Sequence, residues 1–234
     1  MAQKVNAKPA GSAKRIATKA IVGKKIGMTQ MFSPEGVLVP VTVIEAGPCP
    51  IIQKKTVESD GYAALQVGFS AYPERRVRKL VTKPLQGHFK KAGVAPTRRV
   101  RELRLKSVDG LEVGQSVTVD IFKAGDKVDV SGVTKGRGFT GVIQRWNQHT
   151  GPMAHGSKYH RGVGSMGANS TPSRVFKNKH LPGHYGVEKV TAINLTIARV
   201  VPERNLLLVR GAVPGPNGGY LTVRDTVRAR SRGK

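Results

Sequence analysis

Residues 189–199 have the sequence Lys189-Val-Thr-Ala-Ile-Asn-Leu-Thr-Ile-Ala-Arg199, in which apolar and polar side chains alternate. After a short turn, residues 203–210 have the sequence Glu203-Arg-Asn-Leu-Leu-Leu-Val-Arg210. A period of two is typical of a half-buried β-strand, and two such runs joined by a short turn predict a hairpin. The whole of residues 187–224 is therefore predicted to consist of strands.

Residues 20–130 show the same kind of pattern in shorter pieces. Short β-branched runs occur at 20–23 and 37–44, and a further run at 62–69 follows the turn signal Asp60-Gly61. Residues 113–122 alternate between apolar and polar side chains. Gly, Pro and Asp separate these runs. Several short strands with such turn signals predict a small barrel or sandwich. The simplest topology pairs 20–130 with 187–224 in one β-domain.

Residues 131–186 lie between these two β-zones and differ from both. They contain 11 of the 28 glycines and five of the six histidines, but no Asp or Glu. No helical or strand period persists, and so long an irregular segment does not fit inside a compact domain. Its composition cannot offset the entropy of ordering, so we expect disorder in isolation and order only in anionic surroundings. We predict an extended loop that penetrates folded RNA.

Three further segments are unusually basic. Residues 73–106 carry 12 Lys and Arg without a sustained apolar period, which predicts an insertion lying against phosphate, although 100–105 could pair as a strand. Residues 1–19 are basic and free of acid, which favours an arm on RNA over a transit peptide. Residues 225–234 are predicted to be a basic C-terminal tail.

The charge balance identifies the class of partner. The chain has 234 residues with 40 Lys plus Arg and 14 Asp plus Glu, a formal net charge of +26. Such a chain attracts a polyanion, because each neutralised phosphate releases condensed counterions. A positive surface kept only for solubility is the weaker alternative, since self-repulsion would oppose compaction. The single cysteine, Cys49, excludes an internal disulfide and is predicted to be a packed or a bystander thiol. The apolar runs are too short to predict a membrane span.

One glycine motif resembles a nucleotide site. Gly136-Arg-Gly-Phe-Thr-Gly141 matches G-x-G-x-x-G, but a dinucleotide site also needs an acidic residue about 20 positions later. The next acid is Glu188. We therefore favour a flexible strand whose backbone approaches a nucleic acid, and we expect no cofactor.

The histidines of 131–186 raise the possibility of a metal site. Zinc sites usually combine closely spaced Cys or His ligands. The segment has no Cys or acid, and Lys158 and Arg161 beside His155 and His160 would repel a cation. Contacts with bases or phosphate are the better interpretation, and no metal is expected. Trp146 could pack against RNA or against the protein's own loop.

An enzyme active site is not indicated either. Ser157 and Ser165 lie near histidines in sequence, but the segment has no carboxylate that could orient a histidine base. Two other functions stay open as alternatives. One is an RNA-modifying enzyme with a basic docking arm, and the other is a chromatin-like binder of duplex DNA.

Several stretches together resemble a known family, the bacterial-type universal large-subunit ribosomal protein three. The resemblance covers about residues 20–224. It is carried by Gly23-Lys-Lys-Ile-Gly-Met-Thr-Gln30, Val39-Pro-Val-Thr-Val-Ile-Glu-Ala-Gly-Pro48, Asp60-Gly-Tyr-Ala-Ala-Leu-Gln66, Lys83-Pro-Leu-Gln-Gly-His-Phe89, Gly93-Val-Ala-Pro-Thr-Arg98, Val128-Asp-Val-Ser-Gly-Val-Thr-Lys-Gly-Arg-Gly-Phe139, His155-Gly-Ser157, Thr171-Pro-Ser-Arg-Val-Phe-Lys177 and Asn205-Leu-Leu-Leu-Val-Arg-Gly-Ala-Val-Pro-Gly215.

The resemblance implies a mainly β fold, a small translation-protein-like β-barrel with a long extended loop inserted in it and basic terminal arms. It implies a structural rRNA-binding protein, not an enzyme, that binds near the 3′ end of the large-subunit rRNA and nucleates assembly. The loop would extend toward the peptidyl transferase centre, with its tip at 162–174. Neighbours would be large-subunit proteins fourteen and nineteen, in a cytoplasmic ribosome or, as the lesser alternative, an organellar one.

The sequence departs from the family at three places in the extended loop. Ser170 stands where some members carry a methylated glutamine, so that modification is not expected. Ser173 and Asn178 replace usual glycines, and Ser tolerates a positive φ poorly. The backbone there is therefore expected to differ locally.

Composition and resemblance together give the predicted RNA-binding residues. They are Lys24, Lys25, Arg75, Arg76, Lys83, His88, Arg98, Lys135, Arg137, Arg145, Trp146, His155, Lys158, His160, Arg161, Asn169, Arg174, Lys177, Lys179 and His184.

Overall fold

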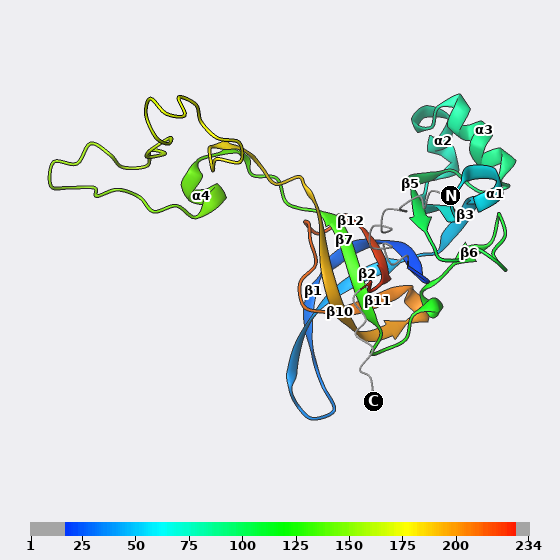
Figure 1. Cartoon of the computed structure of the whole chain (residues 1–234). Helices are drawn as coiled ribbons and strands as arrows, with labels where there is room; N and C mark the ends of the chain where they lie inside the picture. Colours follow the sequence, from blue (N-terminus) through cyan, green and yellow to red (C-terminus); the bar gives the residue numbers. More distant parts are fainter. Residues whose placement is uncertain (1–16, 228–234) are drawn as a thin grey trace, which may run out of the picture.

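The computed structural model describes residues 17–227. The N-terminal arm at 1–19 and the C-terminal tail at 225–234 therefore lie mostly outside the described residues. Within them, the chain forms a β-barrel, a smaller sheet with helices, and a long extension that projects from the barrel (Figure 1).

The barrel is closed and antiparallel, with the strand order β1-β12-β7-β10-β11-β2. Its strands are β1 (Ala20–Phe32), β2 (Leu38–Ala46), β7 (Lys127–Val133), β10 (Lys189–Val201), β11 (Leu206–Arg210) and β12 (Tyr220–Asp225). The 3-10 turn η2 (Pro202–Arg204) joins β10 to β11, which confirms the predicted hairpin. Strands from both ends of the chain pair in one closed sheet, as the simplest topology required. The fold is therefore mainly β, as predicted.

A second sheet lies beside the barrel, with the order β5-β4-β3-β6. Its strands are β3 (Cys49–Lys55), β4 (Ala64–Ala71), β5 (Thr97–Arg104) and β6 (Ser116–Val117), and the short helix α1 (Val57–Asp60) joins β3 to β4. The sequence analysis placed these strands in the barrel zone. Strand patterns specify burial of one face but not the partner sheet, so the division between two sheets was not visible in the sequence.

The basic stretch at 73–106 contains two helices that the sequence analysis missed. They are α2 (Glu74–Leu80) and α3 (Lys83–Lys91), followed by β5. Only Phe89 is buried on α3, and no residue is buried on α2. An apolar period cannot be detected when a helix anchors itself through a single side chain.

The predicted strand at 113–122 is largely wrong. Only β6 forms there, and the 3-10 turn η1 (Val119–Ile121) follows it. Val119 and Phe122 are both buried, and the Phe122 amide donates to the Val119 carbonyl over 3.0 Å. A spacing of three places both side chains on one side of a 3-10 turn, which a strand cannot do.

One hydrophobic core joins the barrel to the second sheet. The same cluster of buried side chains includes Ile21, Ile44 and Leu207 from the barrel and Ile51 and Leu65 from the second sheet. Cys49 is fully buried in it, which confirms the predicted packed thiol. The two sheets are thus one folding unit in the sense of a shared apolar interior.

A buried carboxylate holds an irregularity in β10. Asp129 on β7 is fully buried, and its two oxygens accept from the amides of Asn194 (3.0 Å) and Val227 (3.3 Å). The β7–β10 register shifts between Ala192 and Leu195, and Asn194 has a φ of 59°. The carboxylate therefore satisfies an amide that the bulge removes from the ladder.

The extension leaves the barrel between β7 and β10. It contains β8 (Gly138–Thr140), the short helix α4 (Val142–Trp146) and β9 (Gly183–Tyr185), with irregular chain between α4 and β9. Figure 1 shows it reaching well away from the barrel. None of the helices in residues 17–227 has both the length and the apolar character needed to cross a membrane.

Candidate nucleic-acid interface

The base of the extension is a narrow double strand. The Thr134 amide donates to the Glu188 carbonyl over 2.9 Å, and the Arg137 amide donates to the Tyr185 carbonyl over 2.9 Å. β8 and β9 then pair antiparallel, with Phe139 opposite His184. The glycine motif at 136–141 is thus part of a two-stranded ribbon. The ribbon carries the two arms of the loop outward together.

Trp146 and His180 join the two arms beyond the ribbon. Their rings stack with centroids 4.1 Å apart and planes 4° from parallel. The Trp146 indole and the Arg145 guanidinium both donate to the Leu181 carbonyl over 3.0 Å. Gly183 lies under Arg145, where a Cβ would collide with the guanidinium. Of the two roles considered for Trp146, the structure shows packing against the protein's own loop.

A second cluster, around Tyr159, organises the outer loop. The Tyr159 hydroxyl donates to the Gly162 carbonyl over 2.7 Å, and the ring packs against Gly151 and Gly162. His160 Nδ1 lies 3.0 Å from the Pro152 carbonyl, and the Gly151 amide donates to the His160 carbonyl over 2.8 Å. These glycines allow the close approach of chain to ring that a side chain would prevent.

The two positions that replace family glycines keep the glycine-like backbone. Ser173 has a φ of 57° and Asn178 a φ of 63°. Asn accepts this conformation readily, whereas Ser173 holds it at some cost in strain.

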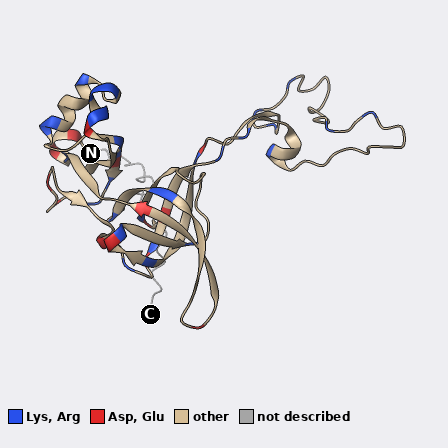
Figure 2. Ribbon diagram, turned by 180° about the vertical axis from the view of Figure 1, so that it is seen from behind, with Lys and Arg blue, Asp and Glu red and all other residues tan. Residues whose placement is uncertain are grey.

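The basic side chains of the extension are exposed and lack acidic partners. Of the eight Lys and Arg at 131–186, seven are exposed and Arg145 is half-buried. In residues 17–227, ion pairs use the cations Lys19, Lys55, Arg104 and Arg224, and none of the predicted RNA-binding Lys or Arg. Figure 2 shows blue segments along the extension with red only near its base. The positive charge is left for an external anion.

Aromatic rings orient several cations, two of them in the extension and one on β5. Arg137 lies 5.9 Å from the Tyr185 ring centroid, Arg174 lies 5.2 Å from that of Phe176, and Arg98 lies 5.5 Å from that of Tyr72. A guanidinium on a ring face loses some freedom but keeps its donors accessible. Such pairs suit the recognition of splayed bases and phosphates in folded RNA.

The second sheet presents another basic surface. Arg75 and Arg76 are exposed on α2, Lys83 is exposed at the start of α3, and Arg98 is exposed on β5. Figure 2 shows several blue segments along these helices. Lys24 is exposed on β1 of the barrel.

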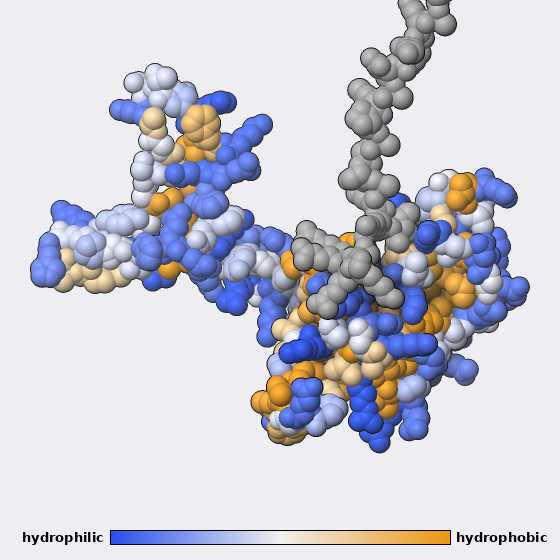
Figure 3. All heavy atoms as spheres, turned by 60° about the horizontal axis from the view of Figure 1, so that its bottom comes forward, coloured by the Kyte–Doolittle hydropathy of each residue, from blue (hydrophilic) through white to orange (hydrophobic). Residues whose placement is uncertain are grey.

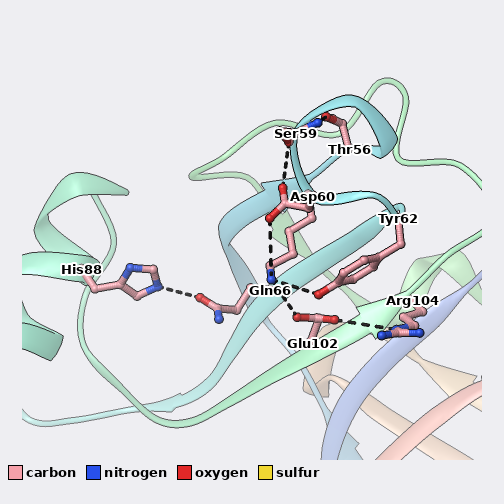
Figure 4. A network of polar contacts seen from close by, with 9 residues as sticks. Thr56, Ser59, Asp60, Tyr62, Gln66, His88, Glu102 and Arg104 are labelled. Carbon is pink, nitrogen blue, oxygen red and sulfur yellow. Dashed lines mark hydrogen bonds and ion pairs between the residues drawn. The ribbon is translucent and has the colours of Figure 1, made fainter.

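Some charged side chains of the second sheet are paired with one another in a network of polar contacts (Figure 4). Lys55 Nζ donates to the Tyr62 hydroxyl over 3.0 Å and lies 3.3 Å from Glu102, and these hydrogen bonds raise its pKa. Arg104 lies over the Tyr62 ring at 4.4 Å. Glu102 is thus already neutralised within the sheet. The Lys and Arg side chains of α2 and α3 take no part in this network.

His88 is engaged inside the protein. Its Nε2 lies 2.6 Å from the Gln66 side-chain oxygen, which joins α3 to β4 (Figure 4). The ring is half-buried. His88 therefore positions α3 on the sheet, and only part of its ring is accessible to RNA.

Lys25 is a correction to the predicted set. It is 7% exposed, and its ammonium donates to the carbonyls of Val213 and Gly215, each over 3.2 Å. Burial lowers its pKa, and the charge of nearby Lys135 lowers it further. Its donors are satisfied by backbone, so Lys25 stabilises the 213–215 loop and offers no surface to phosphate.

The fold also creates a basic groove that the predicted set missed. It runs between the barrel and β5, and its lining includes Arg99, Arg101, Lys189 and Arg224. Arg99 lies 4.6 Å over the Tyr220 ring. These residues come from three distant parts of the sequence. The high density of Arg in 98–104 was the only signal available beforehand.

The remaining predicted residues are exposed along the extension. This holds for His155, His160, Asn169 and His184, and Asn169 lies in the outer loop without a regular element. Within residues 17–227, no three side chains of His, Cys, Asp or Glu gather where they could hold a metal ion.

The β-barrel carries a long acid-free extension, and the cations of this extension have no acidic partner among the described residues. These features are typical of a protein that binds a folded polyanion over an extended surface. The class indicated is a structural nucleic-acid-binding protein.

Residues 104–204 match the family model of ribosomal protein L3. The match runs from the end of β5 through the whole extension to the β10–β11 turn, so it covers the segment that distinguishes this fold. This match supports a place for the chain in the ribosomal protein L3 family. That family implies a structural protein of the large ribosomal subunit that binds rRNA and serves translation.

Proposed function

We propose that this chain is a primary rRNA-binding protein, which binds near the 3′ end of the large-subunit rRNA and nucleates assembly of the subunit. Its extension, residues 131–186, would reach toward the peptidyl transferase centre, with the tip at 162–174. Its neighbours would include large-subunit proteins fourteen and nineteen, in cytoplasmic ribosomes. The protein would act by binding alone and not as an enzyme.

One observation supports this proposal above the others. The extension is acid-free, and its cations have no ion-pair partner among the described residues. A projecting loop with uncompensated charge gains free energy when phosphates surround it, because counterions are released from the RNA. Glycines and single aromatic rings allow it to follow an irregular RNA surface.

We also propose a division of labour along the chain. The barrel zones at 20–130 and 187–224 would seat the protein on the subunit, with the basic insertion at 73–106 on phosphate. The arms at 1–19 and 225–234 would add charge. The contact residues would be the predicted set without Lys25, with Arg99, Arg101, Lys189 and Arg224 added from the groove.

The test replaces residues 131–186 by a short Gly-Ser link in cells that depend on the altered chain. The barrel is expected to fold, because the remaining part of β7, residues 127–130, still pairs with β10 and with β12. Large subunits are expected to assemble poorly and to form peptide bonds slowly. Normal assembly and normal peptide-bond formation would contradict the proposal.

A further inference from the structure

The β1–β2 ribbon is the least basic part of this very basic chain. Residues 26–53 contain no Lys, Arg or His, the longest such stretch in the sequence, and they include Glu35 and Glu45. In the whole chain, Lys and Arg number 40 of 234 residues. The charge that suits the rest of the chain to RNA is therefore missing from one continuous segment.

The outer half of this ribbon extends beyond the barrel (Figure 1). β1 pairs with β12 only over Ala20–Lys24, and β2 pairs with β11 only over Val41–Glu45. From Met28 to Phe32, the ladder partners of β1 are residues of β2 alone. A two-stranded ribbon with two free edges is marginally stable in water, so another surface is expected to cover it.

One face of the outer ribbon is apolar. Phe32 is paired with Leu38 in register, and Met28 lies on the same face four pairs away, beyond the Gln30–Pro40 pair. Phe32 is 67% exposed, and Met28 and Leu38 are each 50% exposed. Val37 is also exposed in the turn. Figure 3 shows hydrophobic surface gathered on the barrel, in contrast to the mainly hydrophilic extension.

The turn adds an acid to this apolar face. The Ser33 amide donates to the Val37 carbonyl over 2.9 Å, and the Val37 amide donates to the Ser33 hydroxyl over 3.1 Å. These bonds close the loop and leave Glu35 exposed at its end. An RNA partner would bring phosphates toward this carboxylate, and residues 26–53 have no basic side chain that could offset the repulsion.

We propose that the outer β1–β2 ribbon, residues 26–40, is a protein-docking surface. It would insert Met28, Phe32 and Leu38 into an apolar surface of a second, basic protein of the large subunit, whose Lys or Arg meets Glu35. Met and aromatic residues with few charges are typical of protein interfaces. A second copy of this chain is disfavoured by the net charge of +26 on each copy. The inference rests on the chain's place in the large subunit.

The test is photo-cross-linking in assembled large subunits, with benzoylphenylalanine at Phe32. The same residue at Phe176 serves as the control, since Phe176 is 58% exposed between Arg174 and Lys177 in the extension. We expect position 32 to cross-link to one other large-subunit protein, at an apolar segment with Lys or Arg nearby. Position 176 should cross-link to rRNA.

Four outcomes at position 32 would overturn the inference: cross-links to rRNA, to residues 1–16 of the same chain, to a second copy, or no product while position 176 reacts. Failure of the proposed function has a different signature, because the chain would then be missing from large subunits or position 176 would not reach rRNA.

Substitution provides an independent measurement. Phe32→Ser with Leu38→Ser should lower retention of the cross-linked partner in salt-washed subunits by about tenfold or more, as expected for two apolar anchors. Glu35→Lys should weaken retention without removing any apolar area. Val57→Ser is the matched control, since Val57 is equally exposed at 67% but lies on α1. Equal retention in all of these variants would contradict the docking surface.

Discussion

At the scale of single residues, buried polar groups set the local chemistry of the barrel. Cys49 is fully buried, and its thiol donates to the Val22 carbonyl over 3.3 Å. Burial raises its pKa to about 11 from an ordinary value of 9.0. The thiolate, which is the reactive form, is therefore suppressed at neutral pH.

Cys49 should resist alkylation in the folded protein. With iodoacetamide at pH 8, we expect labelling only after denaturation, measured by mass spectrometry. Because the unfolded thiol ionises first, stability should also fall as pH rises from about 9 to about 11. Rapid stoichiometric labelling of the native protein at pH 8 would show that the thiol is not enclosed as described.

Asp129 should be a key to barrel stability. Asp129→Ala leaves the amides of Asn194 and Val227 without acceptors and removes the carboxylate 4.0 Å from Arg224. We expect a loss of about 2–3 kcal/mol in the free energy of unfolding. Asp126→Ala is the control, because the partly exposed Asp126 makes an ion pair with Lys19 and accepts from the Lys123 amide near solvent, and its loss should cost less than about 1 kcal/mol. Urea titration of both variants measures the difference, and equal losses would refute the assignment.

At the scale of elements, the extension depends on a contact that links its two arms. Trp146 and His180 lie 34 positions apart but stack closely, and both arms meet at the Leu181 carbonyl. The stack should organise the loop for RNA, in addition to any contact that either ring makes.

A double-mutant cycle tests this role. Trp146→Ala and His180→Ala should each weaken binding to large-subunit rRNA, with a coupling of about 0.5–1.5 kcal/mol between them. Tyr159→Ala with His180→Ala is the control pair, because Tyr159 belongs to the other cluster. Strictly additive losses for Trp146 and His180 would mean that the rings act separately.

The elements also show how far sequence reasoning reaches. The β10–β11 hairpin could be predicted because alternation and a short turn are local signals. The helices α2 and α3 could not, since α2 buries no residue and Phe89 is the one residue that α3 buries. The basic extension was recognisable because the absence of acid over 131–186 needs no structural knowledge.

The contacts of the site were less accessible to prediction. Lys25 was misjudged because sequence does not reveal which lysine of a Lys-Lys pair is buried against another loop. The groove that includes Arg99, Lys189 and Arg224 exists only once distant strands pair. The Trp146–His180 stack likewise depends on the β8–β9 ribbon that aligns the two arms.

At the scale of the whole molecule, the apolar core and the unpaired positive charges lie in different parts of the structure. The barrel and second sheet share one core, whereas the extension holds cations without acidic partners. Stability should therefore come from the first part, and affinity for RNA largely from the second.

Removal of the extension should leave the fold intact. With residues 131–186 replaced by a Gly-Ser link, the midpoint of thermal unfolding should stay within about 5 °C of that of the intact chain, because the extension contributes little to the shared core. Circular dichroism during heating measures this. A large drop in the midpoint would mean that the extension supports the barrel.

The salt dependence of rRNA binding tests the central claim most directly. The eight Lys and Arg of 131–186 are proposed to neutralise phosphates, and each contact contributes about 0.7–0.9 to the slope of log K against log salt concentration. The chain without its extension should therefore show a slope that is smaller by at least about 4, while Lys55→Gln, whose charge Glu102 already compensates, should leave the slope unchanged. An unchanged slope after removal of the extension would contradict the account.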